Sequence, residues 1–287
     1  MSEYHFRPAE AHEARLLRPL WRDGFGDTEA FMACYEARMF RPDRVELAML
    51  GDEAAAMLTV IPAVLRMADG TAVPSGCVYG VATRRQYRRQ GIATRLLETA
   101  VRRRLGHSMD CIAVVPDTPS LFPYYGRAMN ASTAFYLRTV QATAELLCAH
   151  PALRPEAVRA EDYGPVREAG LRGRTHMEWD LEALAFQEEI CREDRGGLFL
   201  FPDAPGCCAA VARREDGSLL VYELLASEDR LAACLGGLLD EMSAKVAEVR
   251  LPAWSGASLG GAIEPFAMLA GRTLPPAMQA YLGFDFA

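Results

Sequence analysis

Val81–Leu97 has the sequence VATRRQYRRQGIATRLL and decides the fold. Its apolar start predicts a buried strand, its basic middle a loop ending in Arg-x-x-Gly-x-Ala, and its end a helix. The first turn of a helix leaves backbone N–H groups unpaired at the positive end of the helix dipole. Gly91 and Ala93 have little or no side chain, so an anion can approach these groups, and Arg88 and Arg89 add positive charge. The stretch therefore predicts a pyrophosphate-binding loop.

The helix after this loop has one apolar face, which indicates that it packs on a core. The apolar positions follow helical spacing: Ile92, Leu96, Leu97 and Ala100. Most charged positions fall on the other faces: Arg95, Glu98, Arg102 and Arg103. Because the helix is docked, we expect its N-terminus, and with it the loop, to be fixed in place.

Composition and charge narrow the function further. The chain has 287 residues, 51% of them hydrophobic, which gives room for two domains with real cores. The net charge is −7, yet residues 84–104 hold eight arginines and one acid, Glu98. This patch suits phosphates, whereas a nucleic-acid-binding surface would be wider and interleaved with aromatics. A nucleic-acid-binding module that uses the arginine cluster is the weaker alternative.

Cysteines, histidines and the N-terminus bear on cofactors and location. The eight cysteines include no Cys-x-x-Cys and the five histidines no ligand pair, so we predict buried free thiols and no metal site. The chain shows no long apolar run and no apolar signal region at its start. We therefore expect a cytoplasmic protein without a membrane partner, and the sequence leaves a homo-oligomer open.

The first half follows a simple order. Pro8 is expected in the first turn of a helix that carries Leu17 and Trp21, with Pro19 kinking or splitting it. Asp27 or Thr28 is expected to cap a second helix. Further elements are predicted as strands at 46–50, 55–67, 72–74, 78–83 and 110–115, a hairpin turn at 69–70, and a helix at 92–105. Two prolines within 148–157 predict a domain boundary, which gives domains 1–147 and 151–287.

The second half repeats this plan without the phosphate loop. We expect a helical region over 177–192, strands at 198–201, 207–213, 219–226 and 246–251, and a helix over 228–245. Ser227 can cap that last helix, while Glu228 and Asp229 lie where the first half has arginines. Two carboxylates there would repel a pyrophosphate, so we predict a degenerate copy of the first domain. An unrelated α+β domain is the alternative.

A second motif supports a family resemblance. Pro119–Arg127 has the sequence PSLFPYYGR and follows the predicted strand at 110–115. The chain lacks Gly-Lys-Ser/Thr and Gly-x-Gly-x-x-Gly, the loops of nucleotide-binding folds. Together with the Arg-x-x-Gly-x-Ala loop, the motif resembles the Gcn5-related N-acetyltransferase (GNAT) superfamily, and Tyr125-Gly126-Arg127 the enhanced-intracellular-survival (Eis) type. That type has an active GNAT domain, a degenerate one and a sterol-carrier-like domain, and we expect this chain to lack the last of these.

The resemblance implies an α/β fold, more fully an α+β fold with a mixed sheet, and a set of site residues. It places acetyl-CoA, used as co-substrate, in a V-shaped opening between the strands at 78–83 and 110–115. Tyr125 matches the tyrosine that acts as general acid, with a core aromatic as the alternative. The residues implied to bind acetyl-CoA are strand positions Val81, Ala82 and Thr83, loop positions Arg88, Arg89, Gln90, Gly91, Ile92, Ala93 and Thr94, and Ser120 and Leu121 beside the pantetheine arm.

The sequence departs from the family pattern at two places, and the general base has to be considered separately. Arg85 stands where the family usually has proline, and Met129-Asn130 where Gly-Phe or Gly-Tyr is usual. In the Eis type the C-terminal carboxylate of the chain reaches the active site, which makes Ala287 the candidate base and Asp285 the second candidate. Residues 281–287 are apolar enough to form a packed terminal strand, which would bring that carboxylate near the site. A terminal edge strand without a chemical role is the alternative.

The sequence thus predicts an acetyl-CoA-dependent N-acetyltransferase. The acceptor is a primary amine on a small molecule or a peptide, and the acetyl group moves by direct attack. Acceptor-side loops vary freely on one fold, so aminoglycosides, polyamines, peptide N-termini and lysines all stay open. A non-catalytic acyl-CoA-binding regulatory protein is the alternative from another class.

Overall fold

A computed structural model describes residues 4–147, 150–275 and 280–286. Contacts divide the chain into two compact units. Unit 1 holds residues 1–65, 72–133 and 267–274, and unit 2 holds residues 66–71, 134–266 and 275–287. The chain passes between the units more than once, because residues 66–71 belong to unit 2 and residues 267–274 return to unit 1.

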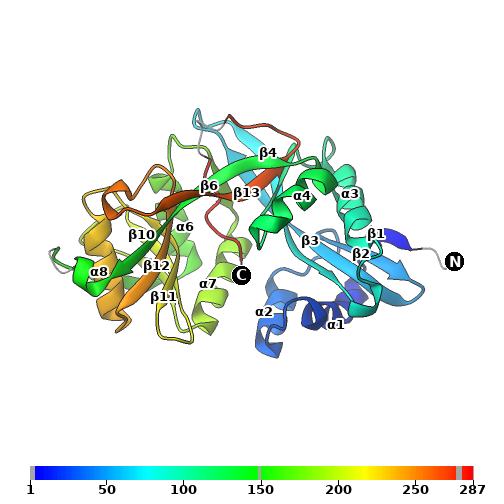
Figure 1. The fold of residues 1–287 in the computed structure, drawn as a ribbon, viewed down its shortest axis with the longest axis horizontal. Helices are drawn as coiled ribbons and strands as arrows, with labels where there is room; N and C mark the ends of the chain where they lie inside the picture. Colours follow the sequence, from blue (N-terminus) through cyan, green and yellow to red (C-terminus); the bar gives the residue numbers. More distant parts are fainter. Residues whose placement is uncertain (1–3, 148–149, 276–279, 287) are drawn as a thin grey trace. The chain divides into compact units, whose positions relative to one another are not determined.

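Unit 1 is a sheet with helices packed on it (Figure 1). Its strands follow the order β1-β2-β3-β4-β5-β13. The first half of the chain contributes these elements: β1 His5–Pro8, η1 Ala11–Glu13, α1 Ala14–Gly24, α2 Glu29–Arg38, β2 Val45–Leu50, β3 Glu53–Arg66, β4 Ala72–Thr83, η2 Arg85–Tyr87, α3 Ile92–Arg104, β5 Cys111–Val114, η3 Pro119–Leu121 and α4 Phe122–Met129. The last strand, β13 Ala262–Ala270, pairs with β5 through Met268–Ala270.

Unit 2 has the same kind of architecture, with strand order β6-β12-β11-β10-β9-β7. Its elements are β6 Ser132–Thr143, α5 Ala144–Leu147, β7 Glu156–Val158, α6 Ala160–Gly170, β8 His176–Trp179, α7 Leu181–Glu193, β9 Gly197–Leu200, β10 Cys208–Arg213, β11 Leu219–Leu225, α8 Leu231–Glu241, β12 Val246–Pro252 and η4 Ala257–Leu259. The core under α8 includes Val221, Leu224, Leu235 and Val249. The predicted mixed α/β fold is confirmed.

Local chemistry explains most element boundaries. Thr28 caps α2 by accepting from the Phe31 N–H, as one of the two predicted caps. β3 and β4 form the predicted hairpin. The turn between them ends at Gly70, which has a φ of +88°. The predicted strands at 72–74 and 78–83 are one continuous strand, β4.

Three expected elements differ from the structure. Pro8 ends β1 instead of opening a helix; a proline is tolerated there because β1 is an edge strand. Pro19 lies inside an unbroken α1. The helical region expected from Met177 begins only at Leu181, because Asp180 caps α7 by accepting from the Ala183 N–H at 2.8 Å.

Residues 280–286, the last that the structure describes, are mostly buried, but they form no strand beyond bridges at Ala280 and Tyr281. Gly283 and Phe286 have φ values of +87° and +60°, which an extended strand does not allow. The expected terminal strand is therefore wrong for the described residues 281–286. Among the described helices, none is both long and apolar enough to cross a membrane.

Candidate active site

The central feature of unit 1 is a pair of parallel strands of unequal length. β4 and β5 pair from Ser75↔Cys111 to Val78↔Val114, where β5 ends, and β4 then continues to Thr83. Gly80 follows the last pair with φ +60°, and a side chain there would meet the Trp21 ring at 2.8 Å, so only glycine fits this position. Val81, Ala82 and Thr83 thus extend beyond the end of β5, which offers them no backbone partner.

The loop from β4 to α3 brings a helix N-terminus to the same strand end. Gly91 is the residue before α3 and has φ +74°, the left-handed region that glycine adopts freely. A Cβ at Gly91 would meet no atom within 4 Å, so the space in front of the loop is open. Ile92, Ala93 and Thr94 form the first turn of α3, whose N–H groups have no partner within a helix. This is the geometry predicted for an anion site.

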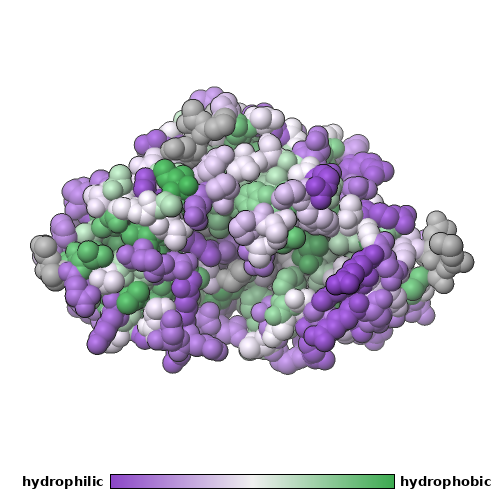
Figure 2. All heavy atoms as spheres, viewed as in Figure 1, coloured by the Kyte–Doolittle hydropathy of each residue, from purple (hydrophilic) through white to green (hydrophobic). Residues whose placement is uncertain are grey.

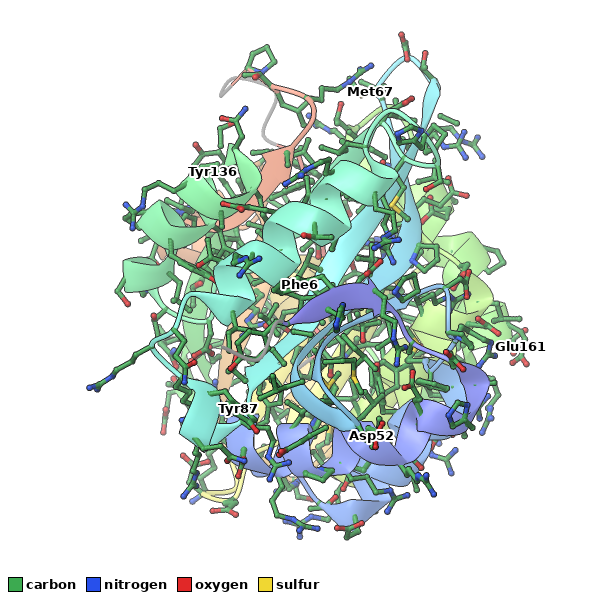
Figure 3. The ribbon with its side chains drawn as sticks, turned by 90° about the vertical axis from the view of Figure 1, so that its right-hand side faces the viewer. Phe6, Asp52, Met67, Tyr87, Tyr136 and Glu161 are labelled. Atoms are coloured by element: carbon green, nitrogen blue, oxygen red, sulfur yellow. The ribbon has the colours of Figure 1, made fainter. Side chains whose placement is uncertain are left out.

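Two carboxylates that the sequence analysis missed hold the loop. Asp23 Oδ2 accepts from Arg84 Nε at 2.9 Å, and Glu53 accepts from the Tyr87 hydroxyl at 2.8 Å and from Arg84 Nη1 at 3.2 Å. Tyr87, labelled in Figure 3, belongs to the short η2 turn that opens the loop. These anchors come from positions far away in sequence, so no local signal could have revealed them.

The arginines divide into two groups. Arg84 and Arg85 form ion pairs with Asp23, and Arg104 is buried with its guanidinium 2.6 Å from Glu46. These three belong to the framework and not to the predicted phosphate patch, which is a correction.

Arg88 and Arg89 are exposed in the loop. Arg88 donates to the Thr83 carbonyl at 3.1 Å and to the Asp23 carbonyl. Arg89 forms no ion pair within the described part of the chain. Hydrophilic side chains gather on the right of Figure 2, where Figure 1 places α3.

Packing fixes α3 as its spacing predicted. Ile92, Leu96, Leu97 and Ala100 are buried in one hydrophobic cluster. On the outside, the Arg95 guanidinium lies 4.9 Å from the ring centroid of Phe6, which Figure 3 labels on β1. The remaining loop residue, Gln90, accepts a hydrogen bond from the Tyr4 hydroxyl at 3.2 Å. The loop and the start of α3 are therefore held from both sides.

Tyr125 lies in α4, and its side chain is 8% exposed. It belongs to the same hydrophobic cluster as Val78 and Val114, the last paired residues of β4 and β5. Burial, with smaller contributions from Tyr124 and Asp117, raises the pKa of Tyr125 above the ordinary phenol value. At neutral pH its hydroxyl therefore keeps a proton that it can donate, although burial makes it a weaker acid than an ordinary phenol.

Ser120 and Leu121 form the turn before α4. Leu121 packs on the same cluster as Tyr125, and the exposed Ser120 hydroxyl lies 2.8 Å from that of Thr118. The structure thus brings the strand end, the loop, the start of α3 and Tyr125 to the parallel pair β4–β5.

Of the two candidate bases, the structure describes only Asp285. Ala287 lies outside the described residues. Asp285 belongs to unit 2, where its Oδ2 accepts from Arg250 Nη1 at 2.6 Å. That ion pair gives Asp285 a structural partner and leaves only its Oδ1, which is buried and unpaired among the described residues.

Unit 2 contains a second pair of parallel strands, and these two strands separate after a short paired stretch. β11 and β12 are parallel and pair only from Leu219↔Ala247 to Val221↔Val249. β11 then runs on to Leu225 against β10, and β12 to Pro252 against β6. The register between β10 and β11 shifts at this point, a bulge that turns β11 away from β12.

The segment after β11 differs chemically from the loop of unit 1. α8 begins at Leu231, and Ser227 does not cap it as expected. Glu228 accepts from the N–H groups of Gly256 at 2.9 Å and Ser258 at 2.8 Å. These bonds lower its pKa below the ordinary value. The carboxylate thus takes up two backbone donors next to η4.

Comparison with known proteins agrees with this geometry. Residues 5–128 match the family model described as the acetyltransferase (GNAT) domain. This part of the chain therefore forms a GNAT acetyltransferase domain, and the protein is an acyltransferase enzyme. A search of curated protein sequences finds no match.

Several solved structures share the fold over both units. A GCN5-related N-acetyltransferase from Anabaena variabilis is 13% identical with a TM-score of 0.74, over 93% of this chain and 72% of its own. One from Kribbella flavida is 17% identical with a TM-score of 0.69, over 93% and 70%. Eis1 from Mycobacterium abscessus is 15% identical with a TM-score of 0.69, over 93% and 73%. At these identities the likeness concerns the fold alone.

Proposed function

We propose that the protein is an acetyl-CoA-dependent N-acetyltransferase that acetylates a primary amine. The proposal rests on one observation: the helix N-terminus at Gly91 faces open space and lies next to the end of β4 that extends beyond its pairing with β5. The pyrophosphate of coenzyme A binds the N–H groups from Gly91 to Thr94, with Arg88 and Arg89 beside it. The pantetheine arm lies along the unpaired edge of Val81–Thr83, near Ser120 and Leu121.

The chemistry needs no acyl-enzyme. The neutral amine attacks the thioester carbonyl, a strand N–H holds the oxyanion, and the C–S bond breaks. Tyr125 gives its proton to the departing sulfur, and a base takes the proton that the amine loses. The products are the acetamide and free coenzyme A. We assign the base to the C-terminal carboxylate of Ala287, because Asp285 is already paired with Arg250.

Unit 2 is proposed to bind no coenzyme A. Glu228 and Asp229 precede α8 where unit 1 has its arginines, and their negative charge opposes a pyrophosphate. The protein then binds one acetyl-CoA per chain.

Calorimetric titration with acetyl-CoA tests the binding. We expect one site per chain, weakened in Arg89→Ala and unchanged in Arg102→Ala, a control that removes the same charge from an exposed position on α3. Two sites per chain would contradict the assignment of unit 2. No binding would contradict the proposal as a whole.

Release of free thiol from acetyl-CoA, measured with a panel of primary amines, tests catalysis. Tyr125→Phe should lower kcat strongly and leave the KM for acetyl-CoA nearly unchanged. Tyr124→Phe is the matched control, since its ring lies 5.1 Å from that of Tyr125. Adding one residue after Ala287 moves the carboxylate and should also lower kcat, whereas Asp285→Asn should not. Acetyl-CoA binding without turnover of any amine would favour the non-catalytic alternative.

A further inference from the structure

Unit 2 contains a cavity of about 490 Å³ at the carboxyl ends of β11 and β12. Pockets of this size hold small ligands in many proteins. Its walls come from both strand ends and from the segment that leads into α8. They include Leu225, Ser227, Arg230, Pro252 and Trp254, together with the Cys207 side chain just before β10. The cavity therefore gives small solutes a route to a thiol that is otherwise buried.

A second cysteine lies against this thiol. Cys234 is in the first turn of α8, where its N–H donates to the Arg230 carbonyl at 2.9 Å. Its thiol interacts with that of Cys207, since each thiol is the largest influence on the pKa of the other, and both cysteines belong to the core cluster of this unit. The two sulfur atoms are thus neighbours without being bonded, since both cysteines are free.

The surroundings favour the thiolate of Cys207. The interaction with Cys234, together with Arg230 and the Ser227 backbone, outweighs burial and lowers the pKa of Cys207 to about 7. The start of α8 adds the positive end of a helix dipole. The same interaction raises the pKa of Cys234. Cys207 lines the cavity, whereas Cys234 is not among the residues that line it, so Cys207 is the nucleophile of the pair.

The other two cysteines that the structure describes in this unit lack these features. Cys208 and Cys191 are fully buried, and burial raises both of their pKa values, that of Cys191 to about 12. Neither lines the cavity. Cys208 is adjacent to Cys207 in sequence, which makes it a matched control.

We propose that Cys207 and Cys234 form a peroxide-reactive dithiol at this cavity. The Cys207 thiolate attacks one oxygen of hydrogen peroxide or of a small alkyl hydroperoxide, the O–O bond breaks, and water or the alcohol leaves after protonation. Cys207 becomes a sulfenic acid. The Cys234 sulfur then attacks the Cys207 sulfur, a second water leaves with the Cys234 proton, and a disulfide forms. Two thiols are oxidised, and one peroxide is reduced.

Peptide mapping after limited treatment with hydrogen peroxide tests the proposal. Free thiols are blocked in the denatured protein, and disulfide-linked peptides are identified by mass. We expect a Cys207–Cys234 link with a loss of two hydrogens, formed at least ten times faster than oxidation of Cys208 or Cys191. Dithiothreitol should reverse it. A link between other cysteines, or equal oxidation of all of them, would overturn the proposal.

Variants separate the two steps. Cys234→Ser should stop at the sulfenic acid, trapped on Cys207 by a cyclic 1,3-diketone, whereas Cys208→Ser should still form the disulfide. Arg230→Ala leaves every cysteine in place and should slow the oxidation of Cys207 several-fold. Unchanged kinetics in Arg230→Ala, or a lack of trapped product in a folded Cys234→Ser protein, would refute the assigned roles. None of these outcomes depends on acetyl transfer.

Discussion

Gly91 offers a sharp test of the anion site, because Gly106 provides a matched control. Both glycines lie in unit 1 with left-handed backbone, φ +74° at each, and a Cβ would meet nothing within 4 Å at either position. Alanine should therefore cost each variant about 1–2 kcal/mol of stability through backbone strain alone. Gly106 follows the C-terminal end of α3, at the opposite end of the helix from the loop.

Only Gly91→Ala should also weaken the binding of acetyl-CoA. Its methyl group enters the open space in front of the α3 N–H groups and displaces the pyrophosphate from one or two charge-assisted hydrogen bonds. Each is worth about 1.5–3 kcal/mol, so the Kd should rise by roughly 10-fold to 100-fold or more. Calorimetry gives the Kd, and urea denaturation gives the stability. Equal acetyl-CoA affinity in the two variants would refute the placement of the pyrophosphate at this helix start.

Three further predictions concern unit 2. Glu223→Gln should destabilise it by about 3–5 kcal/mol, because the fully buried Arg167 loses its fully buried ion pair and keeps only the one with the part-exposed Glu168. The partly exposed Glu248→Gln should cost about 1 kcal/mol or less, and equal losses in urea denaturation would contradict this. Burial opposes ionisation of Glu168, but its hydrogen bond with His176 and its ion pair with Arg167 prevail and lower its pKa. Its contribution to the free energy of unfolding is therefore present above the unfolded pKa near ~4.3, and it is lost as the pH falls from there through the lowered pKa of the folded state. The stability difference between wild type and Glu168→Gln should therefore narrow on acidification, and a constant difference would count against it. Gly283→Ala should destabilise the C-terminal segment, since the new Cβ would lie 2.7 Å from Arg167 Nη2 at a φ of +87°; a protein that resists carboxypeptidase as well as wild type would argue otherwise.

The sequence predicted the loop and α3 well because their signals are local. The glycine before α3, the helical spacing of Leu96 and Ala100, and the apolar start of β4 all lie within one short stretch. The sequence analysis wrongly placed Arg104 in the positive patch, although its helical spacing from Ala100 already indicated a buried position. It lies four residues after Ala100, on the apolar face, and the structure buries it against Glu46.

Other parts of the site depend on contacts between distant positions. Asp23 and Glu53 hold the loop from 61 and 31 residues away, as measured to Arg84. Charge alone could not identify these two acids among the many of the chain. The C-terminal residues were expected to be buried from their apolar composition, and they are. Their backbone could not be predicted, because Phe286 adopts a positive φ that its residue type disfavours.

The two units show how similar backbone features support different chemistry. In each, two parallel strands pair over a short stretch that ends at Val78 with Val114 in unit 1 and at Val221 with Val249 in unit 2, and a segment leads on to a helix. In unit 1 that segment is anchored by two carboxylates, and Gly91 at the helix start faces open space. In unit 2 the carboxylate of Glu228 binds the η4 backbone, and Cys207 lines the cavity at the strand ends. The strand ends are alike, and the few residues around each helix start determine what can bind there.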